Sequence, residues 1–284
     1  MTDLLRVACI QLNSQADIAA NLATIVPQLA EARAQGATLI TLPENATFIG
    51  GDDAARRASA LPEEHHPAIP RFADEAKKLQ TWILCGSLTI QRPDGKLNNR
   101  SYLFAPDGSI AGRYDKIHLF DAQLAGGEHY RESDTVAPGE AAILVDTPFG
   151  GLGLTICYDM RFGALYRDLA KAGAGIITVP AAFTVPTGQA HWHSLLRARA
   201  IESGCFIIAP AQCGTHAGGR RTFGHSVIID PWGAILAEAR DTPTIIYAEL
   251  NLADIGRVRQ MLPSLHHDRP YQAAQPLPRI RDKI

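Results

Sequence analysis

The sequence predicts an α/β protein in which two β-sheets pack face to face between outer layers of helices, an α-β-β-α sandwich. Two observations predict this fold class. Short β-branched strands alternate with stretches of helical period, and further strands are paired by tight turns between them. No repeat or linker divides the 284 residues. We therefore expect a single domain over residues 1–284, in which residues 262–284 form a C-terminal tail without a core of its own.

The composition limits the classes of partner. The chain is 46% hydrophobic and 20% charged, as in ordinary globular proteins, and its net charge of −2 offers no surface for nucleic acid or an anionic membrane. The N-terminus has neither the pattern of a signal peptide nor an apolar run of transmembrane length. Five cysteines without a C-x-x-C pair indicate reduced thiols. We expect a cytoplasmic protein whose partners are small molecules or proteins.

The first elements bring an acidic residue to the end of a buried strand. Residues 5–12 are predicted to form a strand, and the apolar positions between residues 22 and 29 fall on one face of a helix that ends near Gly36. A second strand, residues 38–42, runs into Pro43-Glu44-Asn45. Because ligands gather at strand ends in α/β sheets, Glu44 is a candidate base, although a lone acid there is more often a solvated loop residue.

The next region is predicted to be a β-meander that ends at a lysine. Residues 52–70 are polar and contain several prolines, so we expect a surface segment near the entrance of a site. A helix over residues 72–80 and a strand over residues 82–90 follow. Turn sequences flank a strand at residues 100–105. After a further strand, Lys116 lies among apolar neighbours, where an ammonium group is costly unless it meets a carboxylate.

A cysteine occupies the junction between a predicted strand and a predicted helix. The apolar run at residues 152–156 ends at Cys157. Beyond it, four apolar residues recur at the spacing of one helical face: Phe162, Leu165, Leu169 and Ala172. The N–H groups at the start of such a helix would shift the thiol toward thiolate. A cysteine in an apolar run is more often a small buried hydrophobe, but the polar and aromatic cluster at residues 158–161 favours a site.

The remaining elements complete the sheets. Residues 126–139 form a charged loop that solvation alone would explain. Strands at residues 142–145 and 152–156 pair around the turn at residues 148–150. An amphipathic helix contains Trp192, Leu195, Leu196 and Ala200. Four further strands are expected over residues 176–179, 205–209, 225–229 and 244–249.

These motifs together resemble a known family. Glu44 in TLPEN, Lys116 in YDKIHLF and Cys157 in ICYDMRF are similar, in order and in flanking residues, to the Glu-Lys-Cys triad of the nitrilase superfamily of carbon–nitrogen hydrolases. The resemblance extends from about residue 6 to about residue 271. The stretches TGQAHWHSLLRARAIES, AQCG and GHSVIIDPWG resemble the Nit branch, whose amidases act on deaminated glutathione and on 2-oxoglutaramate.

The resemblance implies the fold in more detail and adds a fourth site residue. It implies the four-layer α-β-β-α sandwich of the nitrilase type and a homodimer or higher homo-oligomer, and we expect no cofactor. It also implies a structural glutamate, which we assign to Glu132 from its context YRESDT, with Glu128 as the alternative.

The chemistry of these residues independently supports amide hydrolysis. Cys157 would attack the amide carbonyl to form a thioester, and Glu44 would accept the thiol proton and later activate water. Lys116 and the backbone N–H of Tyr158 would stabilise the oxyanion. Glu132 would position and partly neutralise this cluster, in which one acidic group is expected to hold a proton.

For the substrate, the resemblance points to four residues: Tyr158, Arg161, Phe183 and Thr187. An arginine fork suits a carboxylate, although a salt bridge between Arg161 and Asp159 is the alternative. We expect an amidase for a small-molecule amide that bears a carboxylate. The stretches RARAIES and AQCG favour deaminated glutathione, with 2-oxoglutarate and cysteinylglycine as products; the alternatives are ω-amidase action on 2-oxoglutaramate, or carbamoyl-amide or nitrile hydrolysis.

Several polar residues are not expected to form a second site, and we expect no metal. His191 and His193 are two positions apart on a helix and face different ways, whereas a helical chelate needs three or four. Cys213 has no base assigned to it and is interpreted as a packing residue. Residues 218–221 are predicted to form a hairpin tip. A solvated tail or a dimer contact explains three further residues: His266, His267 and Asp268.

Overall fold

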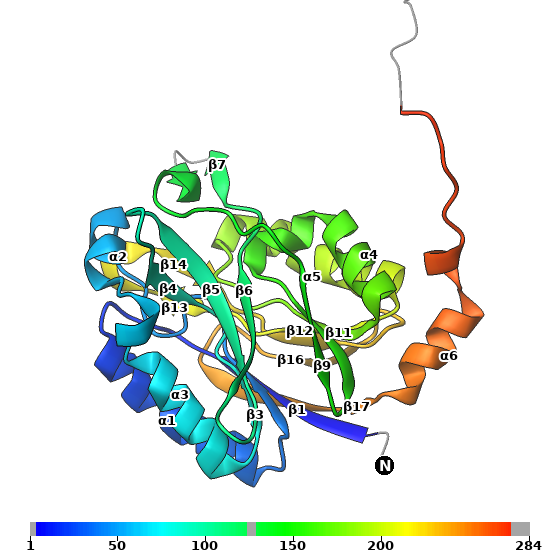
Figure 1. Ribbon diagram of the computed structural model, residues 1–284, viewed down its shortest axis with the longest axis horizontal. Coiled ribbons are helices and arrows are strands. Elements are labelled where there is room, and N and C mark those ends of the chain that lie inside the picture. The colour runs from blue at the N-terminus through cyan, green and yellow to red at the C-terminus, as the bar shows by residue number, and fades with distance from the viewer. Residues whose placement is uncertain (1–3, 124–128, 274–284) are drawn as a thin grey trace, which may run out of the picture.

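The first of two sheets brings the beginning and the end of the chain together, as seen in a computed structural model that describes residues 4–123 and 129–273 (Figure 1). Its strands are β1 (Leu4–Gln11), β2 (Leu39–Thr41), β3 (Trp82–Leu84), β4 (Leu88–Gln91), β5 (Leu97–Phe104), β6 (Ile110–Asp115) and β17 (Thr244–Asn251). Their order is β17-β1-β2-β3-β5-β4, with β6 beside β5. β1 pairs with β17 along its whole length. The last strand is therefore part of the same core as the first.

The second sheet carries three parallel strands at its centre. Its strands are β9 (Ile143–Thr147), β10 (Gly150–Leu154), β11 (Ala174–Thr178), β12 (Phe206–Ala209), β15 (Val227–Ile229) and β16 (Ile235–Glu238). Their order is β16-β15-β12-β11-β10-β9, and β10, β11 and β12 are parallel. A small hairpin of β13 (Cys213–Thr215) and β14 (Arg221–Phe223) confirms the predicted tip at residues 218–221.

Helices cover the outer faces of both sheets. α1 (Ile18–Ala34) and α3 (Ala68–Leu79) pack on the first sheet, and α4 (Gly163–Ala172) and α5 (Val185–Ser203) pack on the second (Figure 1). The shorter α2 (Asp53–Ser59) and α6 (Ala253–Met261) lie at the periphery. The predicted four-layer α-β-β-α sandwich is confirmed. In the described ranges, no helix combines the length and the apolar character that crossing a membrane requires.

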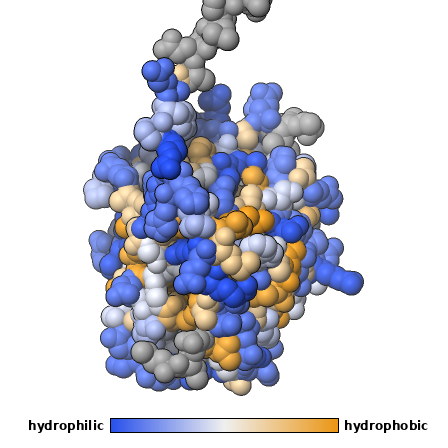
Figure 2. Space-filling view, turned by 90° about the vertical axis from the view of Figure 1, so that its right-hand side faces the viewer, coloured by the Kyte–Doolittle hydropathy of each residue, from blue (hydrophilic) through white to orange (hydrophobic). Residues whose placement is uncertain are grey.

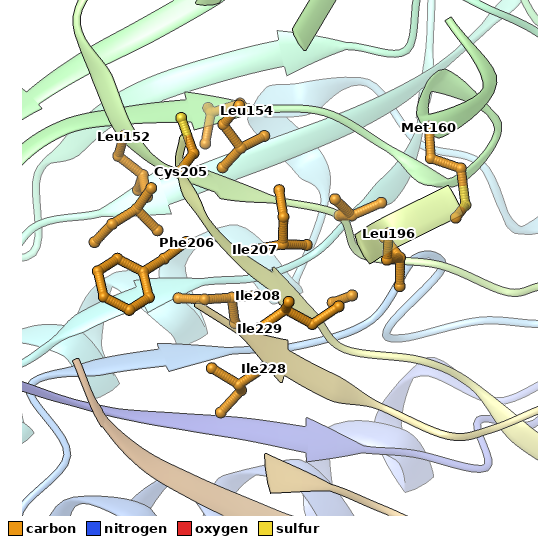
Figure 3. Close-up of a cluster of buried hydrophobic side chains, with 14 of the residues drawn as sticks. Leu152, Leu154, Met160, Leu196, Cys205, Phe206, Ile207, Ile208, Ile228 and Ile229 are labelled. Atoms are coloured by element: carbon orange, nitrogen blue, oxygen red, sulfur yellow. The ribbon is translucent and has the colours of Figure 1, made fainter. Parts of the chain in front are cut away.

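The core has two parts, one on each side of the first sheet. Side chains such as Leu29 of α1 and Phe72 of α3 fill the outer part. The inner part runs between the sheets and continues under α4 and α5; Figure 3 shows Leu154 of β10 and Ile207 of β12 with Leu196 of α5. Because β11 and β12 are buried on both faces, they are continuously apolar rather than alternating.

The prediction of one continuous strand over residues 82–90 was wrong. The chain bends at Gly86 and forms two strands, β3 and β4. Gly86 has a φ of +76°, and a Cβ at this position would lie 2.0 Å from the carbonyl oxygen of Pro43. Only glycine combines this conformation with so close an approach. The bend packs against the chain just before Glu44.

Two segments predicted to be irregular contain regular structure. Within residues 52–70, the Asp52 side chain accepts a hydrogen bond from the N–H of Ala55 and begins α2. Within residues 126–139, β8 (His129–Arg131) pairs with β7 (Asp121–Gln123), and a 3₁₀ helix η2 (Glu132–Asp134) follows. Strands of three mostly polar residues carry too little apolar alternation to be recognised. Glu128 lies outside the described residues.

The described part of the tail is attached to α4. After α6, a 3₁₀ turn η5 (Ser264–His266) is followed by irregular chain. The Arg167 guanidinium donates to the carbonyl of Ser264 at 2.8 Å and to Asp268 at 2.5 Å, and Lys171 also pairs with Asp268. These ion pairs account for Asp268 without a metal ion.

We predict that Gly86→Ala destabilises the protein more than a matched glycine substitution. Gly95 has a similar φ of +82°, but a Cβ there would meet nothing within 4 Å. Gly95→Ala should therefore lower the free energy of unfolding by about 1–2 kcal/mol, because alanine disfavours the left-handed conformation. Gly86→Ala should lower it by about 1–3 kcal/mol more, because the added Cβ overpacks the site. Urea unfolding of both variants measures the difference. Equal costs would contradict the role of the close approach to Pro43.

Candidate active site

Three charged side chains predicted from separate motifs meet in one buried cluster. The Lys116 Nζ donates to Glu44 Oε1 at 2.9 Å and to Glu132 Oε2 at 2.8 Å. Lys116 is only 2% exposed and Glu44 only 3%. An isolated ammonium at this depth would lose its hydration without compensation, so the two carboxylates are what stabilise the buried charge.

Strand ends and backbone N–H groups position the cluster. Glu44 follows β2 and Lys116 follows β6. The N–H of Ala182 donates to Glu44 Oε2 at 3.0 Å, and the N–H of Phe120 donates to Glu132 Oε2 at 2.8 Å. The carboxylates are therefore held by the main chain as well as by Lys116, which fixes their orientation.

Asn99 is a site residue that the sequence interpretation missed. It lies on β5 and is buried, and its Nδ2 donates to Glu44 Oε1 at 2.8 Å and to Glu132 Oε1 at 3.1 Å. The backbone carbonyl of Asn99 also accepts a hydrogen bond from the backbone N–H of Lys116. A signal existed, because the pair Asn98-Asn99 interrupts a buried strand, and buried amides need hydrogen-bond partners. Asn99 thus connects all three charged residues.

Cys157 lies against this cluster in an unusual backbone conformation. It begins a 3₁₀ helix, η3 (Cys157–Arg161), between β10 and α4. Its φ is +49°, which is rare for a non-glycine residue, and its N–H donates to the carbonyl of Pro180 at 2.9 Å. Its thiol and the Glu44 carboxylate lie in the wall of the same cavity, where the two groups interact electrostatically. Such strained conformations often occur where a side chain must be presented to a site.

The expected shift of this thiol toward thiolate was wrong. Burial raises the pKa of Cys157 well above its usual range, the negative charge of Glu44 raises it further, and Lys116 only partly opposes them. The reason is structural: the turn after Cys157 is a short 3₁₀ helix rather than the start of α4. Cys157 is therefore a neutral thiol at pH 7, with a carboxylate beside it to accept the proton.

Asp159 holds the turn that carries Cys157. It is fully buried and accepts hydrogen bonds from the hydroxyl of Tyr114 at 2.7 Å and from the N–H groups of Ile156 at 2.8 Å and His118 at 3.0 Å. The alternative salt bridge to Arg161 was wrong, because these groups, together with the His118 ring, account for both carboxylate oxygens.

The pKa shifts of the charged residues reflect their mutual contacts. Burial alone would lower the pKa of Lys116, but the carboxylates of Glu132 and Glu44 outweigh it and raise this pKa above its usual range. Burial would raise the pKa of Glu132, but Lys116 and Arg56 lower it to about 2. Because the folded pKa lies below the unfolded one, Glu132 stabilises the fold above about pH 4.5 and loses this contribution as the pH falls toward 2.

The cluster opens into a cavity of about 310 Å³. Cys157, Glu44, Lys116 and Glu132 all lie in its wall. The rest of the wall comes from α2 and the chain before it, from the β7–β8 region, from residues 182–184 and 187, and from Tyr158 and Arg220. The expected position of the 52–70 segment near a site is thus correct, since Asp52, Asp53 and Arg56 contribute to the wall.

The residues predicted to bind substrate divide into two groups. Tyr158, Phe183 and Thr187 line the cavity, but Arg161 does not. The Arg161 guanidinium lies over the rings of Tyr158 and Phe183, at 5.7 and 5.6 Å from their centroids. Arg161 therefore contacts two residues of the wall, because its planar cation stacks on their rings. Its role in binding the substrate stays a prediction.

Three other arginines line the cavity: Arg56, Arg131 and Arg220. The Arg220 Nη2 donates to the carbonyl of Ala182 at 3.0 Å, while its buried Nε has no hydrogen-bond partner among the described residues. Spacing alone did not reveal these arginines, because they lie on three separate loops or short elements. By contrast, Cys213 is fully buried and is not part of the wall.

Comparison with known proteins places this geometry in a family. The sequence profile described as carbon-nitrogen hydrolase matches residues 6–260. The chain belongs to the carbon-nitrogen hydrolase family. It is thus a hydrolase that acts on carbon–nitrogen bonds, and the predicted resemblance to the nitrilase superfamily is confirmed.

Three relatives show how closely the chain follows other members. It is 42% identical over 266 residues to the deaminated glutathione amidase of Synechocystis, covering 92% of this chain and 96% of the relative. The Caenorhabditis elegans NitFhit protein superposes with a TM-score of 0.87 at 34% identity, covering 94% of this chain and 66% of the other. An amidase variant from Nesterenkonia, with the acetamide moiety of fluoroacetamide on its active-site cysteine, has a TM-score of 0.78 at 26% identity, over 92% and 95% of the two chains.

We predict that Glu44→Gln lowers the pKa of the Cys157 thiol. Removing the neighbouring negative charge favours thiolate, whereas the exposed Glu140→Gln should have no effect. The measurement is thiolate absorbance near 240 nm against pH, as a difference from Cys157→Ala to remove the other thiols. A titration midpoint below that of a free cysteine in the unsubstituted protein, or no downward shift in Glu44→Gln, would contradict the assignment.

Proposed function

We propose that this hydrolase is an amidase for 2-oxo-acid monoamides, and that its substrate is deaminated glutathione, cleaved to 2-oxoglutarate and cysteinylglycine. The observation that carries this proposal is the buried Glu44–Lys116–Glu132 cluster beside the Cys157 thiol, in the wall of a cavity that three arginines also line. The 42% identity to a deaminated glutathione amidase supports the choice of substrate.

In the proposed acylation step, Glu44 accepts the thiol proton as the Cys157 sulfur attacks the amide carbonyl. Sulfur and carbon form a new bond, and the carbonyl π electrons move to oxygen, giving a tetrahedral oxyanion. When the oxyanion collapses, the carbon–nitrogen bond breaks and the nitrogen takes the proton from Glu44. Cysteinylglycine leaves and a thioester remains. A neutral thiol with a high pKa suits this order of events, because the base is needed only at the moment of attack.

The oxyanion would be stabilised by groups that are already oriented. Lys116 is fixed by two carboxylates, so its charge needs no rearrangement during reaction. Tyr158 is the second residue of a 3₁₀ helix, a position whose N–H has no acceptor within the helix. In this proposal, Glu132 and Asn99 are positioning residues that act through Lys116 and Glu44.

In the proposed deacylation step, Glu44 removes a proton from water as the water oxygen attacks the thioester carbonyl. The carbon–sulfur bond then breaks, the sulfur regains its proton from Glu44, and 2-oxoglutarate leaves. The charge balance of the cluster supports this role: Lys116 offsets one carboxylate, and Arg56 contributes to the charge that keeps Glu132 ionised. Glu44 also lies in the cavity wall with Cys157, where the attacking water would enter.

For substrate recognition, we propose that Arg220 pairs with a substrate carboxylate, with Arg56 and Arg131 providing further positive charge. All three line the cavity, whereas Arg161 contacts two of its rings. An arginine fork gives a carboxylate two parallel hydrogen bonds. We propose that Tyr158, Phe183 and Thr187 contact the remainder of the acyl group.

The second candidate function is ω-amidase action on 2-oxoglutaramate. One observation favours it: a cavity of about 310 Å³ is at the small end of the range for ligand sites. Both substrates share the 2-oxoglutaryl group and differ only in the leaving amine. The remaining alternative is carbamoyl-amide or nitrile hydrolysis, and no feature of the cavity supports it.

We also propose that the protein is a cytoplasmic homodimer whose single domain carries the tail from residue 262 onward. Large apolar side chains remain exposed, including Trp232 at 51%, Met261 at 56% and Leu262 at 57%. The face shown in Figure 2, on the side of α6, mixes apolar and polar areas. Contact with a second copy would bury such side chains.

The cytoplasmic location is supported by free, buried cysteines, with no disulfide between them in the described ranges.

We predict that Glu44→Gln accumulates a thioester on Cys157 when incubated with deaminated glutathione. The substitution removes the base from both steps, but the lowered pKa of Cys157 lets its thiolate attack without a base, whereas the water that attacks the thioester has no other base. Intact-mass measurement should show the added 2-oxoglutaryl group, and Cys157→Ala should show neither adduct nor turnover.

The same proteins distinguish the two candidate substrates. The unsubstituted protein should have a kcat/KM at least tenfold higher for deaminated glutathione than for 2-oxoglutaramate. The reverse ratio supports the ω-amidase alternative, and retained turnover in Cys157→Ala rejects the mechanism.

We predict that Arg220→Gln raises the KM for deaminated glutathione about tenfold or more, as expected for the loss of one charge-assisted pair. The matched control is Arg221→Gln, because Arg221 is the next residue and its side chain is exposed. Steady-state kinetics with both variants measure the effect. A change in kcat with an unaltered KM would show instead that Arg220 acts only by holding Ala182.

A further inference from the structure

A second group of convergent side chains lies outside the cavity. It consists of His193 on α5, His225 just after β14 and Glu238 at the end of β16. The Nε2 of His193 is 2.8 Å from Glu238 Oε1, and the Nδ1 of His225 is 2.9 Å from the same oxygen. One donor atom from each of the three side chains lies within 4.8 Å of the other two. None of these residues lines the cavity.

The backbone holds His225 in a conformation that histidine seldom adopts. Its φ is +56°, its N–H donates to the carbonyl of Arg240 at 3.0 Å, and its carbonyl accepts a hydrogen bond from the Trp192 indole at 2.7 Å. Its ring stacks on Phe223, with centroids 4.3 Å apart. Because a strained backbone persists only where its surroundings enforce it, the direction of this imidazole is fixed by the fold.

The other two members come from rigid elements on either side. His193 follows the fully buried Trp192 on α5, and Glu238 pairs with Val227 across the β15–β16 ladder. His191 and His193 are two positions apart on one helix and face different ways, so they form no chelate with each other. The partners of His193 lie just before β15 and at the end of β16, 32 and 45 positions further along the chain.

We propose that His193, His225 and Glu238 bind a divalent transition-metal ion of the zinc type. Two imidazole nitrogens and a carboxylate oxygen are ligands that Zn²⁺ takes readily, with a fourth position left for water. At metal–ligand distances of about 2.0–2.1 Å, the donors of a tetrahedral site lie about 3.3 Å apart. The two nitrogen–oxygen separations are 2.8 and 2.9 Å and all three donor atoms lie within 4.8 Å of one another, so side-chain rotations must widen the first two and bring the two nitrogens to this value.

The protons of the cluster can be accounted for. One carboxylate oxygen faces both ring nitrogens, so each ring donates an N–H to it in the metal-free protein. When the ion binds, the ligating nitrogen of each neutral ring loses its proton, and the other ring nitrogen carries a proton instead. A ring that is protonated on both nitrogens releases the proton of its ligating nitrogen to solvent. The ion keeps its oxidation state. The three side chains are between 28% and 34% exposed, so both the ion and its water have access.

The bound ion would tie α5 to the edge of the second sheet. Phe223, which stacks on His225, donates its N–H to the carbonyl of Phe183 in the cavity wall. A Cβ on Gly188 would lie 2.2 Å from the Phe223 ring, so the start of α5 is in close contact with the same residue. The site therefore restrains the helix next to the cavity without supplying a group to the Cys157 chemistry.

The test uses the full chain, freed of metal by chelation, and measures Zn²⁺ binding by competition with a chromophoric chelator. We expect one ion per chain and a higher thermal midpoint that excess EDTA reverses. His193→Gln and Glu238→Gln should each weaken binding at least tenfold. His225→Asn should do the same, and asparagine tolerates the left-handed conformation that this position requires. The matched control is His191→Gln, which should bind as the unsubstituted protein does.

Coordination geometry provides a second measurement on the unsubstituted protein. Co²⁺ should give the intense visible absorption of a tetrahedral site, and His193→Gln should lose it. The metal-free melting temperature of each variant shows whether it folds. The proposal is rejected if saturable 1:1 binding is absent, if binding survives the three ligand substitutions, or if His191→Gln weakens binding equally.

Discussion

The structure of the site depends on one interaction, the contact of the Lys116 ammonium with two buried carboxylates. Neither sign of charge could remain at this depth without the other, because burial penalises each ion separately. Removing one partner from such a cluster typically costs about 3–5 kcal/mol, since an uncompensated charge is left behind. The positions of Glu44 and Glu132 are therefore determined by Lys116 as much as by their own backbones.

The complete site, with Cys157 beside this contact, requires that both sheets end at the same place. Lys116 and Glu44 come from the first sheet, while Cys157 and the N–H of Ala182 come from chain that leaves the second. Face-to-face packing of the sheets brings these ends together, and the close approach at Gly86 fixes the chain before Glu44. The apolar core between the sheets thus sets the distances in the polar cluster, although it contributes no polar atom to it.

The cluster also explains why a cysteine with a raised pKa suits this site. A permanent thiolate would add a third negative charge to a site that has one buried ammonium. A neutral thiol beside Glu44 avoids this cost until a substrate carbonyl arrives to share the charge. Arg56 of the cavity wall adds positive charge that acts on Glu132, and Arg131 and Arg220 line the same cavity.

The sequence by itself determined the fold class, the strand ends that precede Glu44, Lys116 and Cys157, and the family, because apolar periodicity and local motifs depend on neighbouring residues. Only the tertiary structure decided what lies across space. It brought Asn99 between two carboxylates, placed Arg220 in the cavity wall and Arg161 against two of its rings, raised the pKa of Cys157, and joined His193 of α5 to His225 and to Glu238 of β16. Burial, electrostatic contact and side-chain direction are properties of the packed molecule, so no local pattern could have revealed them.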